Sequence, residues 1–199
     1  MLFVTDLKWK QHLLSHDQSL IKQLTSRLNG LLLISKRASV KTKLMVANGI
    51  FMSKMYYLFP LWGYCEKYHV KSLQILQNKA ARAVTGQSWF TPIRRLLKDC
   101  KWLSVNQIIF YQTALQTHKI FVAQRPVFFM PRMNTLHPYR TRQAADGCIR
   151  RGEDISGKSF HSRGIKAYNS LPSSIRQSES IQTFKYKLRQ WVSSNIPID

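Results

Sequence analysis

Apolar residues recur every three or four positions along most of the chain, and this spacing predicts a mainly α-helical protein. Leucine and isoleucine residues between positions 13 and 28 predict a first helix that ends near Asn29-Gly30. A second helix is predicted from about Val40 to Phe59, because Pro60 cannot continue it. The first half of the chain therefore predicts a compact bundle of helices.

A third predicted helix, which ends at Gly86, has two faces of different chemistry. Small and apolar residues lie on one side and cations on the other: Leu73, Leu76, Ala80, Ala83 and Val84 against Lys67, Lys71 and Arg82, with Lys79 beside them. Such a helix can pack its apolar face on a core while it presents cations to a polyanion. A charged face that is merely solvated is the alternative interpretation.

The second half of the chain predicts shorter elements around an irregular connector. Pro92 can begin a short fourth helix, and the segment 104–107 forms a capping box for a fifth helix that reaches about Val122. Prolines and glycines then interrupt the periodicity, before two last helices at about 160–171 and 180–194. The predicted organisation is the end of a preceding domain at 1–12, a helical bundle at 13–122, a basic connector at 123–158 and a helical C-terminal segment at 159–199.

Charge is the most unusual property of the chain. Among 199 residues there are 31 Lys and Arg but only 9 Asp and Glu, which gives a formal net charge of +22 and a pI near 10.4. No acid occurs between Asp17 and Glu66, or between Glu66 and Asp99, so internal ion pairs cannot neutralise the cations there. Nucleic acid is the expected partner, and acidic lipid is the weaker alternative.

Arginines and aromatic residues extend this prediction. The connector carries four arginines suited to bidentate phosphate contacts, Arg140, Arg142, Arg150 and Arg151, although a solvated linker is the alternative. Four aromatic residues interleaved with the cations could stack on bases: Trp9, Trp89, Trp102 and Tyr111. Core packing is the alternative for each of them.

Neither a membrane span nor a metal site is expected. Asn48, Lys54 and Pro60 interrupt the apolar run 44–63, which fits a buried amphipathic helix better than a membrane span. The three cysteines are far apart and lack zinc-ligand spacing, as expected for thiols in a reducing compartment. Charged residues at the N-terminus give no signal-peptide pattern, so we expect a nuclear or cytoplasmic protein that is not secreted.

Two segments resemble a known family in the order of their residues: Trp62-Gly63, and Gln77-Asn78-Lys79-Ala80-Ala81-Arg82. Together they resemble the region after the polymerase core of non-LTR (LINE-type) retrotransposon reverse transcriptases of the jockey-like and related groups. Further segments fit the same family in the same order. The residues Asp6-Leu7-Lys8-Trp9-Lys10-Gln11-His12 look like the family's "D-x-L-x-W-x-x-H" passage at the end of the palm, one residue shorter between Asp and Leu.

The later segments continue this resemblance towards the C-terminus. Leu96-Leu97 with Trp102-Leu103-Ser104-Val105 resembles the family's "Leu-x-W-L-x-V" helix start. The segment 159–172 resembles the "W-N-x-L-P" close, with Tyr168 where Trp is usual. Phe184-Lys185-Tyr186-Lys187-Leu188 resembles the Phe-Lys-x-x-Leu helix that normally ends these proteins.

The resemblance implies a thumb-like helical bundle that holds a template–product duplex by its backbone, and C-terminal helices that engage element RNA or target DNA. Polymerisation in this family needs paired aspartates on the palm, because two-metal catalysis requires clustered carboxylates. No adjacent aspartates occur here, and Ala144-Ala145-Asp146-Gly147 supplies only one carboxylate. The family's endonuclease segment is also missing. We therefore expect no polymerase or nuclease activity, no cofactor and no catalytic metal.

The sequence thus predicts a non-catalytic part of a retrotransposon reverse transcriptase that binds RNA or DNA, with a palm and fingers domain as a further partner. The predicted contacts are Lys67, Lys71, Lys79, Arg82, Arg140, Arg142, Arg150 and Arg151. One alternative is an inert truncated remnant of a retroelement. Another is a repurposed protein-interaction module that docks through the apolar face of the last helix, where Ile181, Phe184, Leu188 and Trp191 lie.

Overall fold

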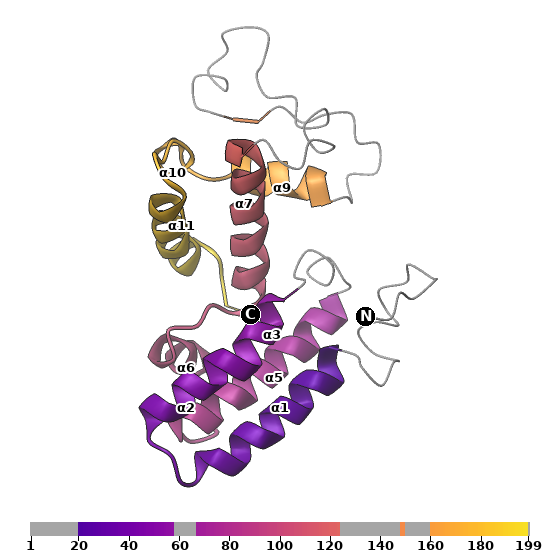
Figure 1. Ribbon diagram of the computed structural model, residues 1–199, viewed down its shortest axis with the longest axis vertical. Helices are drawn as coiled ribbons and strands as arrows, with labels where there is room; N and C mark the ends of the chain where they lie inside the picture. Colours follow the sequence, from indigo (N-terminus) through magenta and orange to yellow (C-terminus); the bar gives the residue numbers. More distant parts are fainter. Residues whose placement is uncertain (1–19, 58–66, 124–147, 150–159, 199) are drawn as a thin grey trace, which may run out of the picture. The chain divides into compact units, whose positions relative to one another are not determined.

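The computed structural model describes residues 20–57, 67–123, 148–149 and 160–198 (Figure 1). All regular secondary structure within these ranges is helical, which confirms the mainly α prediction. The chain forms two compact units, a first unit of Met1–Ile108 together with Ile198–Asp199 and a second unit of Ile109–Pro197. The boundary falls inside one helix, whereas the sequence pattern placed that helix in a single bundle at 13–122. The predicted segment limits at 1–12, 123–158 and 159–199 stay predictions.

The first described helix, α1 (Leu20–Ser35), runs through the Asn29-Gly30 pair at which a stop was predicted. Burial explains the continuation. Leu31 follows the pair and is fully buried, as is Leu24 on the same side. A glycine inside a helix costs about 1 kcal/mol relative to alanine. Burying a leucine side chain contributes roughly 2 kcal/mol or more, so the packing of Leu31 outweighs the glycine.

The second predicted helix is helical from Val40 to Tyr56 but is not uniform. It consists of α2 (Val40–Val46), the π-helical segment η2 (Ala47–Met52) and α3 (Ser53–Tyr56). Ser39 caps its start, since its Oγ accepts a hydrogen bond from the Thr42 amide at 3.2 Å. The Arg27 guanidinium of α1 donates a hydrogen bond to the carbonyl of Ile50 in this π-helical segment. The predicted end at Pro60 lies outside the described residues.

The next three helices follow the predictions closely. The cationic helix α5 (Lys67–Thr85) ends at Gly86, whose positive φ of 67° favours glycine. Pro92 precedes α6 (Ile93–Asp99). The capping box at the start of α7 (Val105–Ala123) is confirmed in both directions. The Gln107 backbone N–H donates to Ser104 Oγ at 3.3 Å, and the Ser104 backbone N–H donates to Gln107 Oε1 at 3.0 Å.

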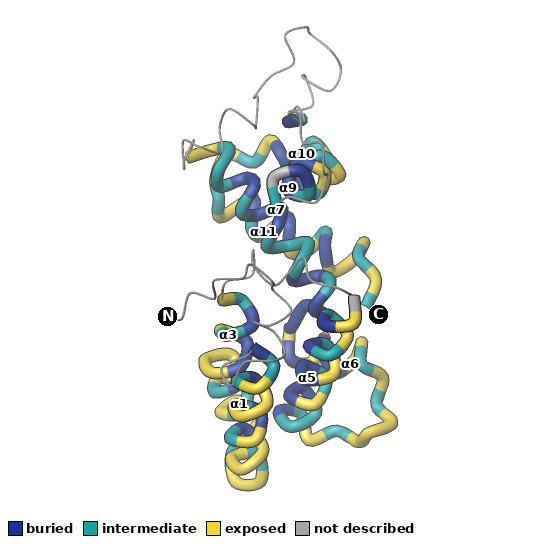
Figure 2. Tube along the Cα trace, turned by 90° about the vertical axis from the view of Figure 1, so that its right-hand side faces the viewer, coloured by how far each residue is buried: buried dark blue, intermediate teal, exposed yellow. Residues whose placement is uncertain are grey.

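An aliphatic core holds the first unit together. Helix α1 packs chiefly on α5, and both also contact the helix formed by α2 and η2. Both α1 and α5 alternate between buried and exposed residues along their length, as expected for helices with one side on a core (Figure 2). Its fully buried side chains include Leu24, Leu31, Phe51, Met55, Leu73, Leu96 and Leu97.

An aromatic core holds the second unit together. Its helices are the C-terminal part of α7, α9 (Phe160–Asn169), α10 (Ser173–Arg176) and α11 (Ile181–Asn195). The imidazole of His118 stacks on the ring of Phe184, with centroids 3.7 Å apart and planes 5° apart, and Tyr168 lies against both rings. Helices α7 and α9 approach so closely that a Cβ at Gly164 would clash with Thr117 Oγ1. Only glycine fits there without a shift.

Two features of the second unit differ from the predictions. The short helix α10 was not predicted, and it begins directly after Pro172, which presets the backbone for a helix start. The buried face of α11 consists of Phe184, Leu188 and Val192, so it is rotated away from the predicted line through Ile181 and Trp191. Trp191 is half-buried instead, against the ring of Phe110 at 5.5 Å.

Candidate nucleic-acid interface

Three of the predicted cations of α5, Lys71, Lys79 and Arg82, lie on the side of the helix that faces away from the core. Lys71 and Lys79 are exposed and Arg82 is half-buried, whereas the side chain of Lys67 lies outside the described residues. Lys71 and Arg82 are about three helical turns apart, so they lie on the same side and about 16 Å apart along the axis. On the opposite side Leu73, Ala80 and Val84 are buried. The predicted division of α5 into a core face and a cationic face is confirmed.

Arg82 takes part in a contact that the sequence pattern did not predict. After α5 the chain folds back, and the guanidinium carbon of Arg82 lies 4.4 Å from the centre of the Trp89 ring. Its Nη2 also donates a hydrogen bond to the Trp89 carbonyl at 3.3 Å. A guanidinium that stacks on an aromatic face gains a cation–π attraction and keeps its charge. Arg82 therefore orders the loop after α5 while it remains a cation on this face.

The aromatic residues that were predicted to stack on bases differ in their exposure to solvent. Trp102 is buried and donates from Nε1 to Asn48 Oδ1 at 2.8 Å, so it belongs to the core. Tyr111 is half-buried, and burial raises its pKa although Arg189 opposes the shift. Trp89 is 69% exposed, and Trp9 lies outside the described residues. Of the three described residues, only Trp89 presents its ring to solvent.

Sequence reasoning missed Phe90, Arg94 and Arg95 as site residues. Phe90 is 92% exposed, and both arginines are exposed on the first turn of α6, directly after the loop. The acid nearest in sequence, Asp99, accepts a hydrogen bond from Gln87 Nε2 at 2.7 Å. The signal was present in the sequence, since an aromatic pair lies between the turn residues Gly86 and Pro92 within an acid-free stretch.

The remaining predicted contacts, Arg140, Arg142, Arg150 and Arg151, lie outside the described residues. Close to them in the sequence, the described segment Cys148-Ile149 is joined to α9 by two hydrogen bonds. The Asn169 side chain accepts from the Ile149 amide at 2.9 Å and donates to the Ile149 carbonyl at 2.8 Å. The predicted binding role of the connector arginines stays a prediction.

Several described residues in or beside the family segments serve the fold. Gln77 is buried and donates from Nε2 to the Leu103 carbonyl at 2.8 Å, while Gln74 Oε1 accepts from the Val105 amide at 2.8 Å. The segments 77–82 and 96–105 are thus joined by an amide clamp, consisting of Gln74 and Gln77, at the start of α7. This contact gives a physical reason why the two segments occur together.

Tyr168, where the family usually has Trp, is also a core residue. Its hydroxyl donates to the Arg176 carbonyl at 3.3 Å, and burial raises its pKa to about 12. Both Trp and Tyr combine a large apolar ring with one hydrogen-bond donor, so Tyr168 keeps the two properties that this position uses.

The described residues hold no group of three or more His, Cys, Asp or Glu side chains that could bind a metal ion. Cys100 is buried, and burial together with Asp99 raises its pKa to about 11. No helix among the described residues has the length and apolar character needed to cross a membrane.

Comparison with known proteins yields two curated relatives. The chain is 35% identical over 75 residues to the "Probable RNA-directed DNA polymerase from transposon X-element" of Drosophila melanogaster, covering 37% of this chain and 8% of that protein. It is 23% identical over 124 residues to the RNA-directed DNA polymerase from mobile element jockey of Drosophila funebris, covering 60% of this chain and 13% of that protein. No protein-family model and no solved structure matches the chain.

The matched part of the chain therefore spans a small share of each relative's length. The predicted resemblance is confirmed at this level: the chain is homologous to part of the RNA-directed DNA polymerases of Drosophila non-LTR retrotransposons.

Proposed function

We propose that this chain is a non-catalytic, nucleic-acid-binding part of a retrotransposon reverse transcriptase, which contacts the phosphate backbone of RNA or DNA. The observation that carries the proposal is the exposed cationic side of α5, with Lys71 and Lys79 outside and a packed apolar side inside. The apolar side forms the core, and Lys71 and Lys79 lie outside it. Their high density on one side suits a polyanion.

The scarcity of acids supports the same conclusion. Of the nine acids, the described ranges contain only Asp99 and Glu179. The ranges 20–57 and 67–123 carry many Lys and Arg and one acid, Asp99, so most of these cations cannot find an acidic partner within them. Contacts to phosphate from such cations position a nucleic acid without reading its sequence.

The proposal assigns no catalysis to this chain. Two-metal phosphoryl transfer needs clustered carboxylates, and no two aspartates are adjacent in the sequence. In a complete polymerase the first unit would act as a thumb beside a palm that carries those carboxylates. RNA-directed DNA polymerase activity is attributed to the relatives, and this chain would contribute binding to it.

The surface expected for the alternative, a protein-interaction module, is used in part by the fold. Its docking face was to be the apolar side of α11, but Phe184 and Leu188 are fully buried within the second unit. An inert remnant is tested by the same experiment as the main proposal.

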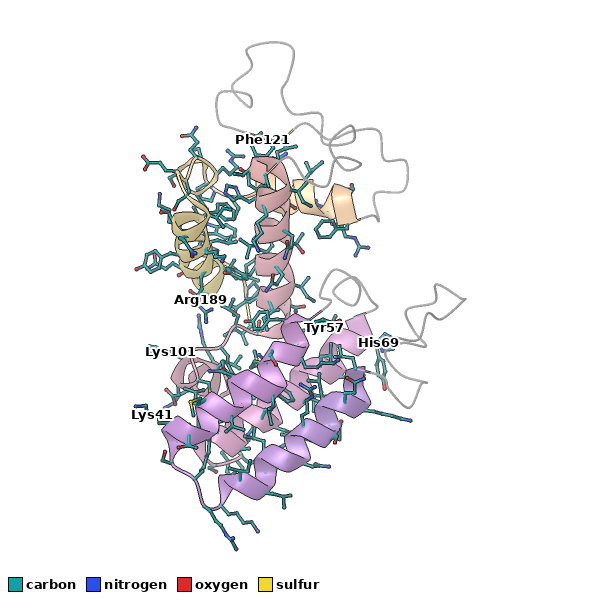
Figure 3. The ribbon with its side chains drawn as sticks, viewed as in Figure 1. Lys41, Tyr57, His69, Lys101, Phe121 and Arg189 are labelled. Atoms are coloured by element: carbon teal, nitrogen blue, oxygen red, sulfur yellow. The ribbon has the colours of Figure 1, made fainter. Side chains whose placement is uncertain are left out.

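The test is binding of fluorescently labelled RNA and DNA oligonucleotides, followed by anisotropy at increasing salt. We expect micromolar or weaker affinity at physiological salt and a steep fall as salt rises. The double substitution Lys71→Glu and Lys79→Glu should weaken binding by at least tenfold. Lys41→Glu, at an exposed position on α2 (Figure 3), is the control for a change of net charge and should have a smaller effect.

Two outcomes would contradict the proposal. Absence of binding even at low salt would favour the inert remnant. Affinity that stays flat across the salt series would show that phosphate contacts do not dominate. Equal losses per charge in the α5 and α2 variants would overturn the assignment of α5, because they would reflect net charge alone.

A further inference from the structure

The loop between α5 and α6 exposes two adjacent aromatic side chains. Trp89 is 69% exposed and Phe90 is 92% exposed, whereas the aromatic rings of the second unit's core are buried. We call this pair the Trp89–Phe90 platform. Large exposed apolar side chains that are adjacent in the chain are unfavourable in water and commonly mark a binding surface.

The platform is held in place by its neighbours. The Arg82 guanidinium packs on the Trp89 ring at 4.4 Å and bonds to the Trp89 carbonyl. The Thr91 amide donates to the Ser88 carbonyl at 3.0 Å, which closes a tight turn around the two aromatic residues. A loop ordered in this way loses less conformational entropy when a ligand binds.

Cations surround the platform in the sequence and on the adjoining helices. Arg82 lies at the end of α5, and Arg94 and Arg95 are exposed on the first turn of α6. No acid occurs between Glu66 and Asp99, and Asp99 is engaged by Gln87. The occupant should therefore combine flat apolar rings with negative charge.

We infer that the Trp89–Phe90 platform stacks unpaired bases of single-stranded RNA or DNA, while Arg82, Arg94 and Arg95 contact the adjoining phosphates. This inference rests on the proposed function and deepens it, because it names the strand state that the loop recognises. Bases in a duplex are already stacked on one another and cannot lie on a protein ring except at an end. Exposed aromatic residues beside arginines suit single strands, whose bases are free to stack.

The test compares three oligonucleotides of equal length: a single strand, the same strand with abasic positions, and a duplex. Phe90→Ala should weaken single-strand binding by about 5- to 100-fold, the range expected for one lost stacking contact. Duplex and abasic binding should stay within about twofold. The wild-type protein should bind the abasic strand at least as weakly as the Phe90→Ala variant binds the normal strand, because abasic positions remove the stacking on Trp89 as well.

Two matched variants control for changes in shape and packing. Phe90→Trp keeps a ring at the position and should retain single-strand binding. Leu33→Ala removes a similarly exposed apolar side chain (79% exposed) from α1 and should leave binding unchanged. Trp89→Ala should resemble Phe90→Ala, and a thermal melt of each variant would detect any loss of folding.

The outcomes separate this inference from the proposed function. If salt-dependent binding persists but Phe90→Ala weakens all three oligonucleotides equally, or none of them, the stacking inference is wrong and the cationic side of α5 is unaffected. If the wild-type protein binds none of the three even at low salt, the proposed function itself fails.

Discussion

The two compact units differ in the part that aromatic residues play in their cores. The second unit builds its core on the stacked rings of His118, Tyr168 and Phe184, although Tyr186 is exposed. The first unit has a mainly aliphatic core that also buries Phe51 and Trp102, while its loop between α5 and α6 presents Trp89 and Phe90 to solvent. Aromatic residues of the same type therefore pack in a core at some positions and are exposed at others, and burial distinguishes the two cases.

The polar groups of the cores differ as well. The amide clamp of the first unit, Gln74 and Gln77, satisfies backbone groups at the start of α7. In the second unit the buried imidazole of His118 stands among rings, and its Nδ1 has no hydrogen-bond partner. The first unit also buries a histidine, His69 on α5. Amides do not titrate whereas an imidazole does, so the pH dependence considered next is that of His118 in the second unit.

The strongest way to break this comparison is to delete one ring from each unit. Phe184→Ala should lower the free energy of unfolding of the second unit by about 3–5 kcal/mol, because a fully buried ring leaves a cavity. Phe90→Ala should change stability by less than about 0.5 kcal/mol. Hydrogen exchange of α9 and α11 against α1 and α5, followed by mass spectrometry in urea, measures both. Similar losses from the two substitutions would contradict the contrast.

Acid should destabilise the second unit through the protonation of His118. Burial lowers the pKa of His118 from 6.5 to about 4, so below pH 6.5 the unfolded chain binds a proton that the folded unit does not. The second unit should therefore lose stability as the pH falls from about 6.5 to about 4, by roughly 3 kcal/mol in all. Tyr168, which faces His118, has its pKa raised to about 12 and stays neutral in this range.

The measurement is urea denaturation of the second unit at several pH values, read from the exchange of α9 and α11. His118→Phe removes the titrating group but keeps a flat ring, so this variant should lose much less stability between pH 6.5 and 4. A wild-type profile as flat as that of the variant would show that His118 is protonated in the folded state.

The smallest effect is expected from the amide clamp. Gln77→Leu keeps a side chain of similar size but removes the amide, so the Leu103 carbonyl loses its hydrogen-bond donor. This loss should destabilise the first unit by about 2 kcal/mol. Lys79→Leu, at an exposed position on the same helix, should have little effect. Urea denaturation, followed by the hydrogen exchange of α5 and α7, measures the stability of both variants. A neutral Gln77→Leu would mean that water or another donor replaces the amide.

Local signals predicted several helix limits well. Gly86 and Pro92 mark the end of α5 and the start of α6, and Ser104 with Gln107 caps α7 as expected. The predicted stop at Gly30 was wrong, because burial of Leu31 outweighs the preference of glycine for helix ends. The π turn of η2 was not predicted, since its helical periodicity differs little from that of an α-helix in so short a stretch.

For the candidate interface, periodicity correctly placed Lys71 and Lys79 outside and Leu73 and Val84 inside, because a helix face depends only on local spacing. The sequence alone also determined the excess of positive charge and the order of the family motifs. Only the tertiary structure decided which aromatic residues are free. Trp102 and Trp89 lie in similarly basic stretches, yet Asn48, distant in sequence, holds Trp102 in the core, while Arg82 supports Trp89 at the surface. Burial depends on contacts between residues far apart in the chain, and no local pattern specifies those contacts.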